Sequence, residues 1–129
     1  MARGYEVFLA CPEGKGIAHF ESLGIRHRSL SLERSSMDPR DELGTLWAIR
    51  RILREIRPDV LHAITLKPVL YGGLVARMER VPLVVSAISG LGYTFIARGA
   101  KAKAVRAGLL AGVRLALGSR RRRVIFQNP

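Results

Sequence analysis

The sequence predicts an α/β protein in which a parallel sheet is covered by helices on both faces. Short apolar runs alternate with helix-length segments, which is the pattern of parallel strands that are buried on both sides. The alternation is clearest between Pro58 and Tyr93, where the runs Asp59–Ile64 and Leu83–Ile88 flank a helical segment, Val69–Glu79. At 129 residues the chain has the length of one domain with its own core.

Three elements are expected in the first third of the chain. Tyr5–Cys11 is apolar and rich in β-formers, which predicts a buried strand. Ile17–Leu23 predicts a short helix that Gly24 closes. Arg26–Leu32 alternates charged and apolar residues less cleanly, which indicates a strand near the edge of a sheet.

A longer amphipathic helix follows. Asp38 provides its N-cap and Pro39 its first position, and Pro58 ends it. Apolar residues at spacings of three and four give it one apolar stripe, and arginines occupy the opposite face. The stripe consists of Leu43, Leu46, Ile49, Leu53 and Ile56, and Trp47 and Ile52 widen it.

The last third is expected to hold a basic amphipathic helix, Ala100–Leu117, and a final strand, Val124–Gln127. Val81–Ala97 carries no charge, but it is shorter than the roughly 20 residues that a membrane-spanning helix needs. Pro82 also interrupts it, so a buried strand and a loop explain this segment better than a membrane span does.

The positive charge of the chain is concentrated toward its C-terminus. The formal net charge is +12, and residues 80–129 hold 10 basic residues and no acidic one. Such asymmetry indicates an anionic partner, either a phospholipid surface or a phosphate-bearing substrate. The expected membrane or anion patch consists of Lys101, Lys103, Arg106, Arg114, Arg120, Arg121, Arg122 and Arg123.

Ligands of such sheets bind at the carboxyl ends of the strands, and two polar segments follow those ends here. Thr65–Pro68 places Lys67 where a cation could meet a phosphate or a sugar carboxylate, although a solvated lysine is an equal alternative. Ser89–Tyr93 offers backbone N–H groups and glycines that allow close approach, with a plain tight turn as its alternative. The candidate cleft residues are Thr65, Lys67, Ser89, Gly90, Gly92 and Tyr93.

The motifs predict neither a metal site nor a dinucleotide site. His62 lies within a strand, where a hydrogen-bonded core histidine is the favoured interpretation and a functional histidine is the alternative. His19 and His27 are expected on the surface, and no metal-ligand spacing links the three histidines. Cys11 is the only cysteine, which excludes an intrachain disulfide. Gly90-Leu91-Gly92 lacks the third glycine of a dinucleotide fingerprint.

Four stretches carry a resemblance to a known family. They are GYEVFLACPEG (Gly4–Gly14), IRPDVLHAITLKPVLYGGLVAR (Ile56–Arg77), VPLVVSAISGLGYTF (Val81–Phe95) and VIFQNP (Val124–Pro129). Together they resemble the N-terminal, acceptor-side domain of subfamily-4-like glycosyltransferases with the GT-B architecture. Within that group they are most similar to bacterial enzymes that build lipopolysaccharide, capsule or other lipid-linked glycans.

The resemblance implies a Rossmann-like, three-layer half of a GT-B fold, with residues 1–129 forming a partial N-terminal domain. It implies metal-independent, retaining transfer of a sugar from a nucleotide-sugar to a glycan or lipid-linked acceptor. Lys67 and Ser89–Tyr93 would line the acceptor side of the cleft, and the basic patch would hold the enzyme at the inner face of the cell membrane. The donor would bind a C-terminal domain outside this chain, so no cofactor is expected here and the chain alone is expected to be inactive. A catalytic residue is not carried over, because Ile88-Ser89-Gly90 stands where many relatives have a histidine.

The family also implies a strand and a glycine-bearing loop before Gly4, and we expect them to be missing from this chain. In the family's strand order that strand lies between those matching Tyr5–Cys11 and Asp59–Ile64. These two strands must then pair directly or leave backbone groups exposed. We therefore expect the isolated chain to be marginally stable or prone to aggregation, and a reversible, cooperative melt would contradict this.

Two alternatives stay open at this point. The charge alone is compatible with a small basic nucleic-acid-binding protein, but the aromatic residues are few and do not alternate with the arginines, and no recognition motif occurs. Nucleic acid is therefore not expected as a partner. Another GT-B or epimerase-like sugar-nucleotide enzyme would share the fold and differ in its chemistry.

Overall fold

The computed structural model describes residues 4–31, 39–88, 107–108, 111–112, 114–115, 118 and 122–126. It confirms an α/β fold with parallel strands. The chain divides into two compact units, Met1–Ala48 and Ile49–Pro129, and the division falls within the long helix α2.

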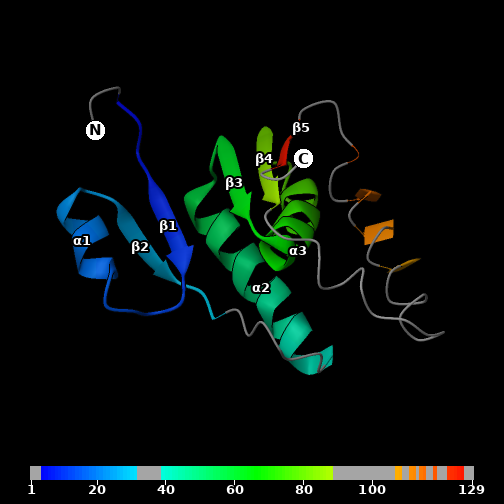
Figure 1. The fold of residues 1–129 in the computed structure, drawn as a ribbon, viewed down its shortest axis with the longest axis horizontal. Helices are drawn as coiled ribbons and strands as arrows, with labels where there is room; N and C mark the ends of the chain where they lie inside the picture. Colours follow the sequence, from blue (N-terminus) through cyan, green and yellow to red (C-terminus); the bar gives the residue numbers. More distant parts are fainter. Residues whose placement is uncertain are drawn as a thin grey trace. The chain divides into compact units, whose positions relative to one another are not determined.

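The first unit contains a two-stranded parallel sheet (Figure 1). β1 (Phe8–Cys11) pairs with β2 (Arg26–Ser29), with Phe8 opposite Arg26. The short helix α1 (Ile17–Ser22) joins them and contacts β2. The helix ends as predicted at Gly24, whose φ of 79° suits glycine and whose N–H donates to the carbonyl of Glu21 at 2.8 Å.

Helix α2 (Pro39–Ile56) is buried along only part of the predicted stripe. Leu53 is 5% exposed, and Ile49 is also buried. By contrast, Leu43 is 59% exposed and Trp47 is 66% exposed. The apolar stripe is therefore buried toward the C-terminal half of the helix and exposed at Leu43 and Trp47.

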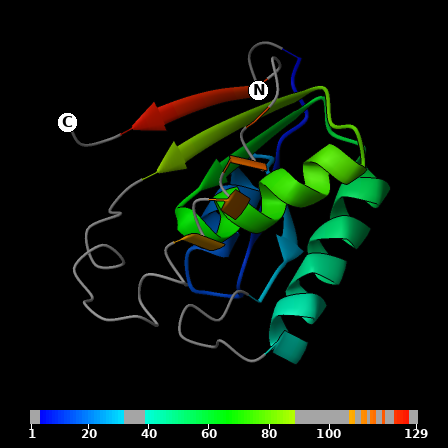
Figure 2. The ribbon, with the colours of Figure 1, turned by 90° about the vertical axis from the view of Figure 1, so that its right-hand side faces the viewer.

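The second unit contains a three-stranded parallel sheet in the order β3-β4-β5 (Figure 2). The strands are β3 (Val60–Ile64), β4 (Leu83–Ile88) and β5 (Arg122–Phe126). Helix α3 (Leu66–Met78) joins β3 to β4 and packs on both. It begins three residues earlier than predicted, because Pro68 needs no N–H partner in a first helical turn.

One face of this sheet forms the core with α3. Val69 of α3 lies against Ala63 and Ile88 in a buried apolar cluster. Val84 and Ser86 of β4 are also buried. The Ser86 hydroxyl has no hydrogen-bond partner in the part of the chain that the structure describes.

The opposite face of β3 is exposed along the strand, at Val60, His62 and Ile64. The prediction that His62 is a core histidine is therefore wrong. Strand alternation explains the error, because the neighbours Leu61 and Ala63 face α3, near Gly72, and His62 must point the other way.

The two strands expected to flank a missing strand do not pair with one another. Among the described residues, β1 pairs only with β2, and β3 pairs only with β4.

The last strand starts two residues earlier than expected, so Arg122 and Arg123 are strand residues that pair with Val84 and Val85. Before it, the described residues 107–108, 111–112 and 114–115 are helical, as predicted for the basic helix. Arg77 of α3 donates from Nη1 to the carbonyl of Leu115 at 3.2 Å. A Cβ at Gly112 would lie 2.7 Å from Leu70 Cδ1, so this segment lies against α3.

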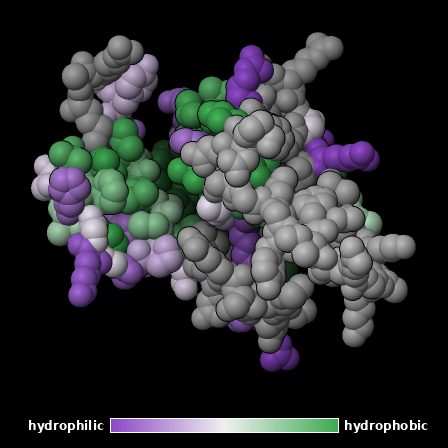
Figure 3. Space-filling view, viewed as in Figure 1, coloured by the Kyte–Doolittle hydropathy of each residue, from purple (hydrophilic) through white to green (hydrophobic). Residues whose placement is uncertain are grey.

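Hydrophobic side chains remain on the surface of the first unit, as Figure 3 shows in green. Tyr5, Val7, Phe20 and Leu23 are all exposed. No residue of α1 is buried. The sheet of this unit therefore forms without a core of the kind that α3 builds in the second unit.

Candidate functional site

The carboxyl ends of β3 and β4 lie side by side. Ile64 pairs with Ala87, and the N–H of Thr65 donates to the carbonyl of Ala87 at 3.0 Å. Because the strands are parallel, both chains leave the sheet at the same edge. The sequence prediction that the two strand ends share one edge is confirmed.

Thr65 has a backbone conformation that is rare for a residue with a side chain. Its φ is 73° and its ψ is 165°, a region that glycine normally occupies. Such a residue costs about 1–3 kcal/mol and persists only where its surroundings hold it. Two backbone hydrogen bonds hold Thr65. Its N–H donates to the Ala87 carbonyl, and its carbonyl accepts from the Val69 N–H at 3.0 Å.

Thr65 is also the N-cap residue of α3, although its side chain makes no capping hydrogen bond. The first hydrogen bond of the helix is the one from Val69, so the N–H groups of Leu66 and Lys67 lie ahead of the regular ladder. Together with the helix dipole, such groups favour an anion at this end. The arrangement can therefore attract a phosphate or carboxylate.

Lys67 is the second residue of α3. The sequence had suggested a position in the loop before the helix, and that prediction is wrong. It is half-buried and takes part in an interaction within the structure. Its charge adds to the positive end of the helix dipole on which it stands. Of the candidate cleft residues, the structure brings together Thr65 and Lys67, and Ser89, Gly90, Gly92 and Tyr93 lie outside the described residues.

The expected basic patch is described only in part. Arg114 and Arg123 are both exposed, and Arg122 is in β5. Lys101, Lys103, Arg106, Arg120 and Arg121 lie outside the described residues.

Two further expectations concern metals and histidines. Over residues 4–31, 39–88 and the short described segments beyond, no group of three or more potential ligands is placed to hold a metal ion. His27 was predicted on the surface, but its side chain is only 8% exposed, so that prediction is wrong. Its Nε2 lies 3.0 Å from the carbonyl oxygen of Cys11, and Nδ1 is 3.9 Å from Glu13 Oε1. This bond across β1 and β2 explains its burial.

No helix within the described part of the chain has the length and apolar character that would let it cross a membrane.

The strained conformation of Thr65 is the feature of this site that sequence reasoning missed. Threonine is a β-branched residue for which a positive φ is unfavourable, so nothing in its identity signals the conformation. Its position between a strand and Pro68 indicated a polar crossing and no more.

Comparisons with known proteins agree with this arrangement. Residues 1–128 match the family described as glycosyl transferase 4-like. Over 101 residues the chain is 26% identical to the N,N'-diacetylbacillosaminyl-diphospho-undecaprenol alpha-1,3-N-acetylgalactosaminyltransferase of Campylobacter jejuni. That match covers 78% of this chain and 27% of the relative.

The fold is similar to that of MurG from Acinetobacter baumannii, with a TM-score of 0.57 and 16% sequence identity. The similarity covers 99% of this chain and 38% of MurG. The chain therefore spans about a quarter of the curated relative and well under half of the solved structure. It has the fold of one Rossmann-like half of a GT-B enzyme.

Proposed function

Because the chain belongs to the glycosyl transferase 4-like family, we propose that it is the acceptor-side half of an enzyme of cell-surface glycan synthesis. The enzyme transfers a sugar from a nucleotide-sugar to a glycan or lipid-linked acceptor. The acceptor binds at the shared carboxyl edge of β3 and β4. The observation that carries this proposal is the strained Thr65, held against β4 at the N-terminus of α3.

The chemistry of this edge suits a phosphate-bearing acceptor. The amides of the first turn of α3 and the Lys67 ammonium place positive charge at one point of the edge. The name of the Campylobacter relative specifies a diphospho-undecaprenol acceptor, whose diphosphate is the kind of group that such a site attracts. A lipid-linked diphosphate is therefore the acceptor class we favour for this chain.

In this proposal the chain binds and orients the acceptor and leaves activation of the donor to a second domain. A helix N-terminus contributes about 0.3–1 kcal/mol to an exposed anion, so positioning is its expected contribution. The metal-independent, retaining course of the reaction comes from the family resemblance. The nucleotide-sugar would bind outside this chain, in agreement with the 27% of the Campylobacter relative that the match covers.

The exposed Arg114 and Arg123 belong to the basic stretch that we propose holds the enzyme at the cytoplasmic face of an anionic membrane. Each well-placed cation contributes about 1 kcal/mol near such a surface. Sedimentation with phosphatidylglycerol vesicles measures this binding, and equal binding to neutral phosphatidylcholine vesicles would exclude the electrostatic part.

Family membership argues against the small nucleic-acid-binding protein and against an epimerase-like enzyme, the two alternatives that the sequence left open.

The acceptor site is tested by Lys67→Ala in the full natural protein that carries this chain. We expect KM for the lipid-linked acceptor to rise about tenfold while KM for the nucleotide-sugar stays unchanged, because the proposal assigns Lys67 to acceptor binding alone. Lys15→Ala is the matched control, since Lys15 is exposed and lies in a turn of the first unit. An unchanged acceptor KM in Lys67→Ala, or an equal rise in Lys15→Ala, would contradict the assignment.

A further inference from the structure

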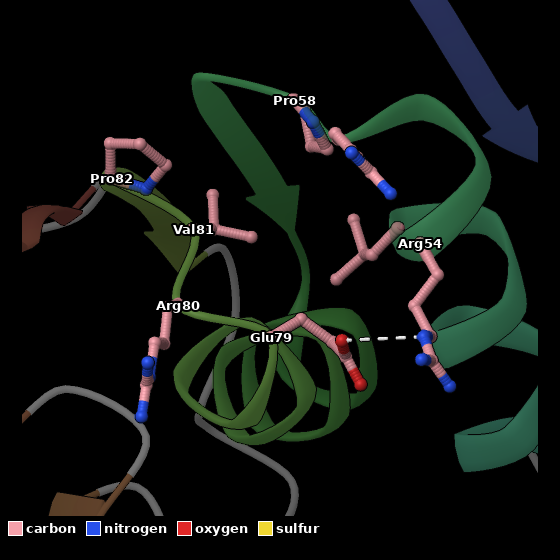
Figure 4. A pocket seen from close by; sticks show the side chains of 8 residues that line it. Arg54, Pro58, Glu79, Arg80, Val81 and Pro82 are labelled. Atoms are coloured by element: carbon pink, nitrogen blue, oxygen red, sulfur yellow. Dashed lines mark ion pairs between the residues drawn. The ribbon is translucent and has the colours of Figure 1, made fainter.

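A cavity of about 310 Å³ lies at the edge of the sheet opposite the proposed acceptor site (Figure 4). Pro58 and Pro82, which stand just before β3 and β4, form part of its wall. Leu53 and Val81 complete the apolar part. The cavity is thus at the amino-terminal edge of the two strands, away from the edge where we propose that the acceptor binds.

The charged part of the wall is strongly basic. Arg54 and Arg57 come from the end of α2, and Arg80 and Glu79 come from the end of α3. Three arginines and one glutamate therefore contribute to the wall. The neighbouring acidic residue in sequence, Asp59, is not part of the wall.

The single carboxylate of the wall, Glu79, already forms ion pairs with Arg50 and Arg54. Glu79 is only 18% exposed, and its Oε1 is 2.5 Å from Arg50 Nε while its Oε2 is 3.7 Å from Arg54 Nε. Figure 4 shows Glu79 turned toward Arg54, with Arg80 leaving the opposite side of the same turn. Within the described part of the chain, no ion pair involves Arg57 or Arg80.

Arg57 and Arg80 also stand in conformations that disfavour a side chain. Their φ values are 48° and 58°, in the left-handed region. Among described non-glycine residues only Thr65 shares a positive φ, and it lies at the proposed acceptor site. Strain of this kind is concentrated at functional sites.

Both arginines occupy helix-ending positions that glycine fills best. The Arg57 N–H donates to the Leu53 carbonyl at 2.8 Å, which is a simple left-handed cap. The Arg80 N–H donates to Arg77 at 3.4 Å and the Val81 N–H to Ala76 at 2.9 Å, which is the Schellman arrangement. Glycine would adopt these backbone conformations at a lower free-energy cost. We therefore look for a function of the arginine side chains that would explain the strain.

We propose that this cavity binds a phosphate-bearing anion through Arg54, Arg57 and Arg80. The planar guanidinium group matches the oxygens of phosphate and binds them with two parallel hydrogen bonds. Arg57 and Arg80 are exposed, and their long stems let both groups turn onto a ligand. The volume lies at the lower end of the range for small-molecule sites, which suits a diphosphate or a phospholipid headgroup. The site is separate from the proposed acceptor edge and goes beyond the proposed function.

The test uses the full natural protein with single substitutions Arg57→Gly and Arg80→Gly. Each removes a guanidinium group and relieves the positive φ, so the protein stays folded with an unchanged or higher melting temperature. Arg51→Ala is the matched control, because it removes the same charge from an exposed position of α2 outside the cavity.

Binding is measured with two probes, inorganic pyrophosphate in calorimetry and phosphatidylglycerol vesicles in sedimentation. We expect each glycine variant to weaken binding about tenfold or more and Arg51→Ala to leave it within about twofold. Loss of pyrophosphate binding would identify a free phosphate group as the ligand, and loss confined to vesicles would identify a lipid headgroup. If neither probe distinguishes the glycine variants from Arg51→Ala, the arginines are solvated helix ends and the proposal is wrong.

A fall in melting temperature in both glycine variants would also overturn it, because the arginines would then be retained for stability. The acceptor KM of Lys67→Ala tests the other edge of the sheet. The two proposals can therefore fail independently.

Discussion

The two units follow the same alternation of strands and helices but bury their hydrophobic residues very differently. In the first unit α1 has no buried residue. Among the described residues of this unit, Leu30 is the one buried apolar side chain. In the second unit α3 buries Val69, Val75 and Ala76 against the sheet. Parallel pairing by itself therefore does not make a core, and a helix long enough to cover two strands does.

The length of the covering helix accounts for this difference. α1 has 6 residues and packs chiefly on one strand, whereas α3 has 13 residues and packs on two. Burial of apolar surface contributes roughly 25 cal/mol per Å², so the helix that covers two strands supplies more of the stability. We expect the second unit to exchange its amide hydrogens more slowly than the first.

The largest effect is expected from two leucines of the same helix. Leu53→Ala should lower the free energy of unfolding by about 2–4 kcal/mol, because Leu53 is 5% exposed and its removal leaves a cavity. Leu43→Ala, at a position 59% exposed, should change it by less than about 0.5 kcal/mol. Urea denaturation of the full protein measures both, and equal losses would show that Leu43 is covered in solution.

Smaller effects on the free energy of unfolding are expected at two helix ends, and the two have opposite signs. Gly24→Ala in the first unit should destabilise by about 1 kcal/mol, because the φ of 79° at this position disfavours a side chain. Arg80→Gly in the second unit should stabilise by about 0.5–1 kcal/mol, because it removes the same conflict. Melting temperatures by calorimetry give the signs, and a loss of stability in Arg80→Gly would show that its side chain stabilises the turn.

An effect no larger than that of Arg80→Gly is expected at Ser86, a fully buried residue in the core of the second unit. Its hydroxyl has no partner among the described residues, and a buried unsatisfied hydroxyl costs free energy. Ser86→Ala should therefore stabilise by about 0.5–1 kcal/mol, as measured by the urea midpoint. A destabilising result would show that the hydroxyl is bonded to water or to a segment outside the described residues.

The strands of the second unit could be predicted closely from the sequence. Leu83–Ile88 was predicted with the observed bounds, and Asp59–Ile64 was predicted one residue too long. In the first unit, Tyr5–Cys11 was predicted three residues too long, and the strand predicted from Arg26 ends at Ser29. Apolar runs between prolines and glycines locate strands well, because strand pairing needs such runs regardless of what covers them.

The position of the candidate site could be predicted from the sequence, but the conformations of its residues could not. The carboxyl edge followed from the order of strands and helices, and Thr65 and Lys67 were named from it. Their conformations could not be predicted, since the positive φ of Thr65 depends on its hydrogen bond to Ala87, a residue 22 positions away in the chain. The basic cavity was missed because Arg54 and Arg80 line one space only where the end of α2 lies near the end of α3.

The amino-acid sequence by itself determined the parallel α/β class, the positions of the strands and the edge at which a ligand is expected. These depend on the alternation of apolar and polar residues, which acts over a few residues at a time. The tertiary structure alone decided which half of α2 is buried, which face His62 occupies and where arginines take a conformation suited to glycine. Those properties depend on contacts between segments distant in the chain, and local residue preferences carry no information about such contacts.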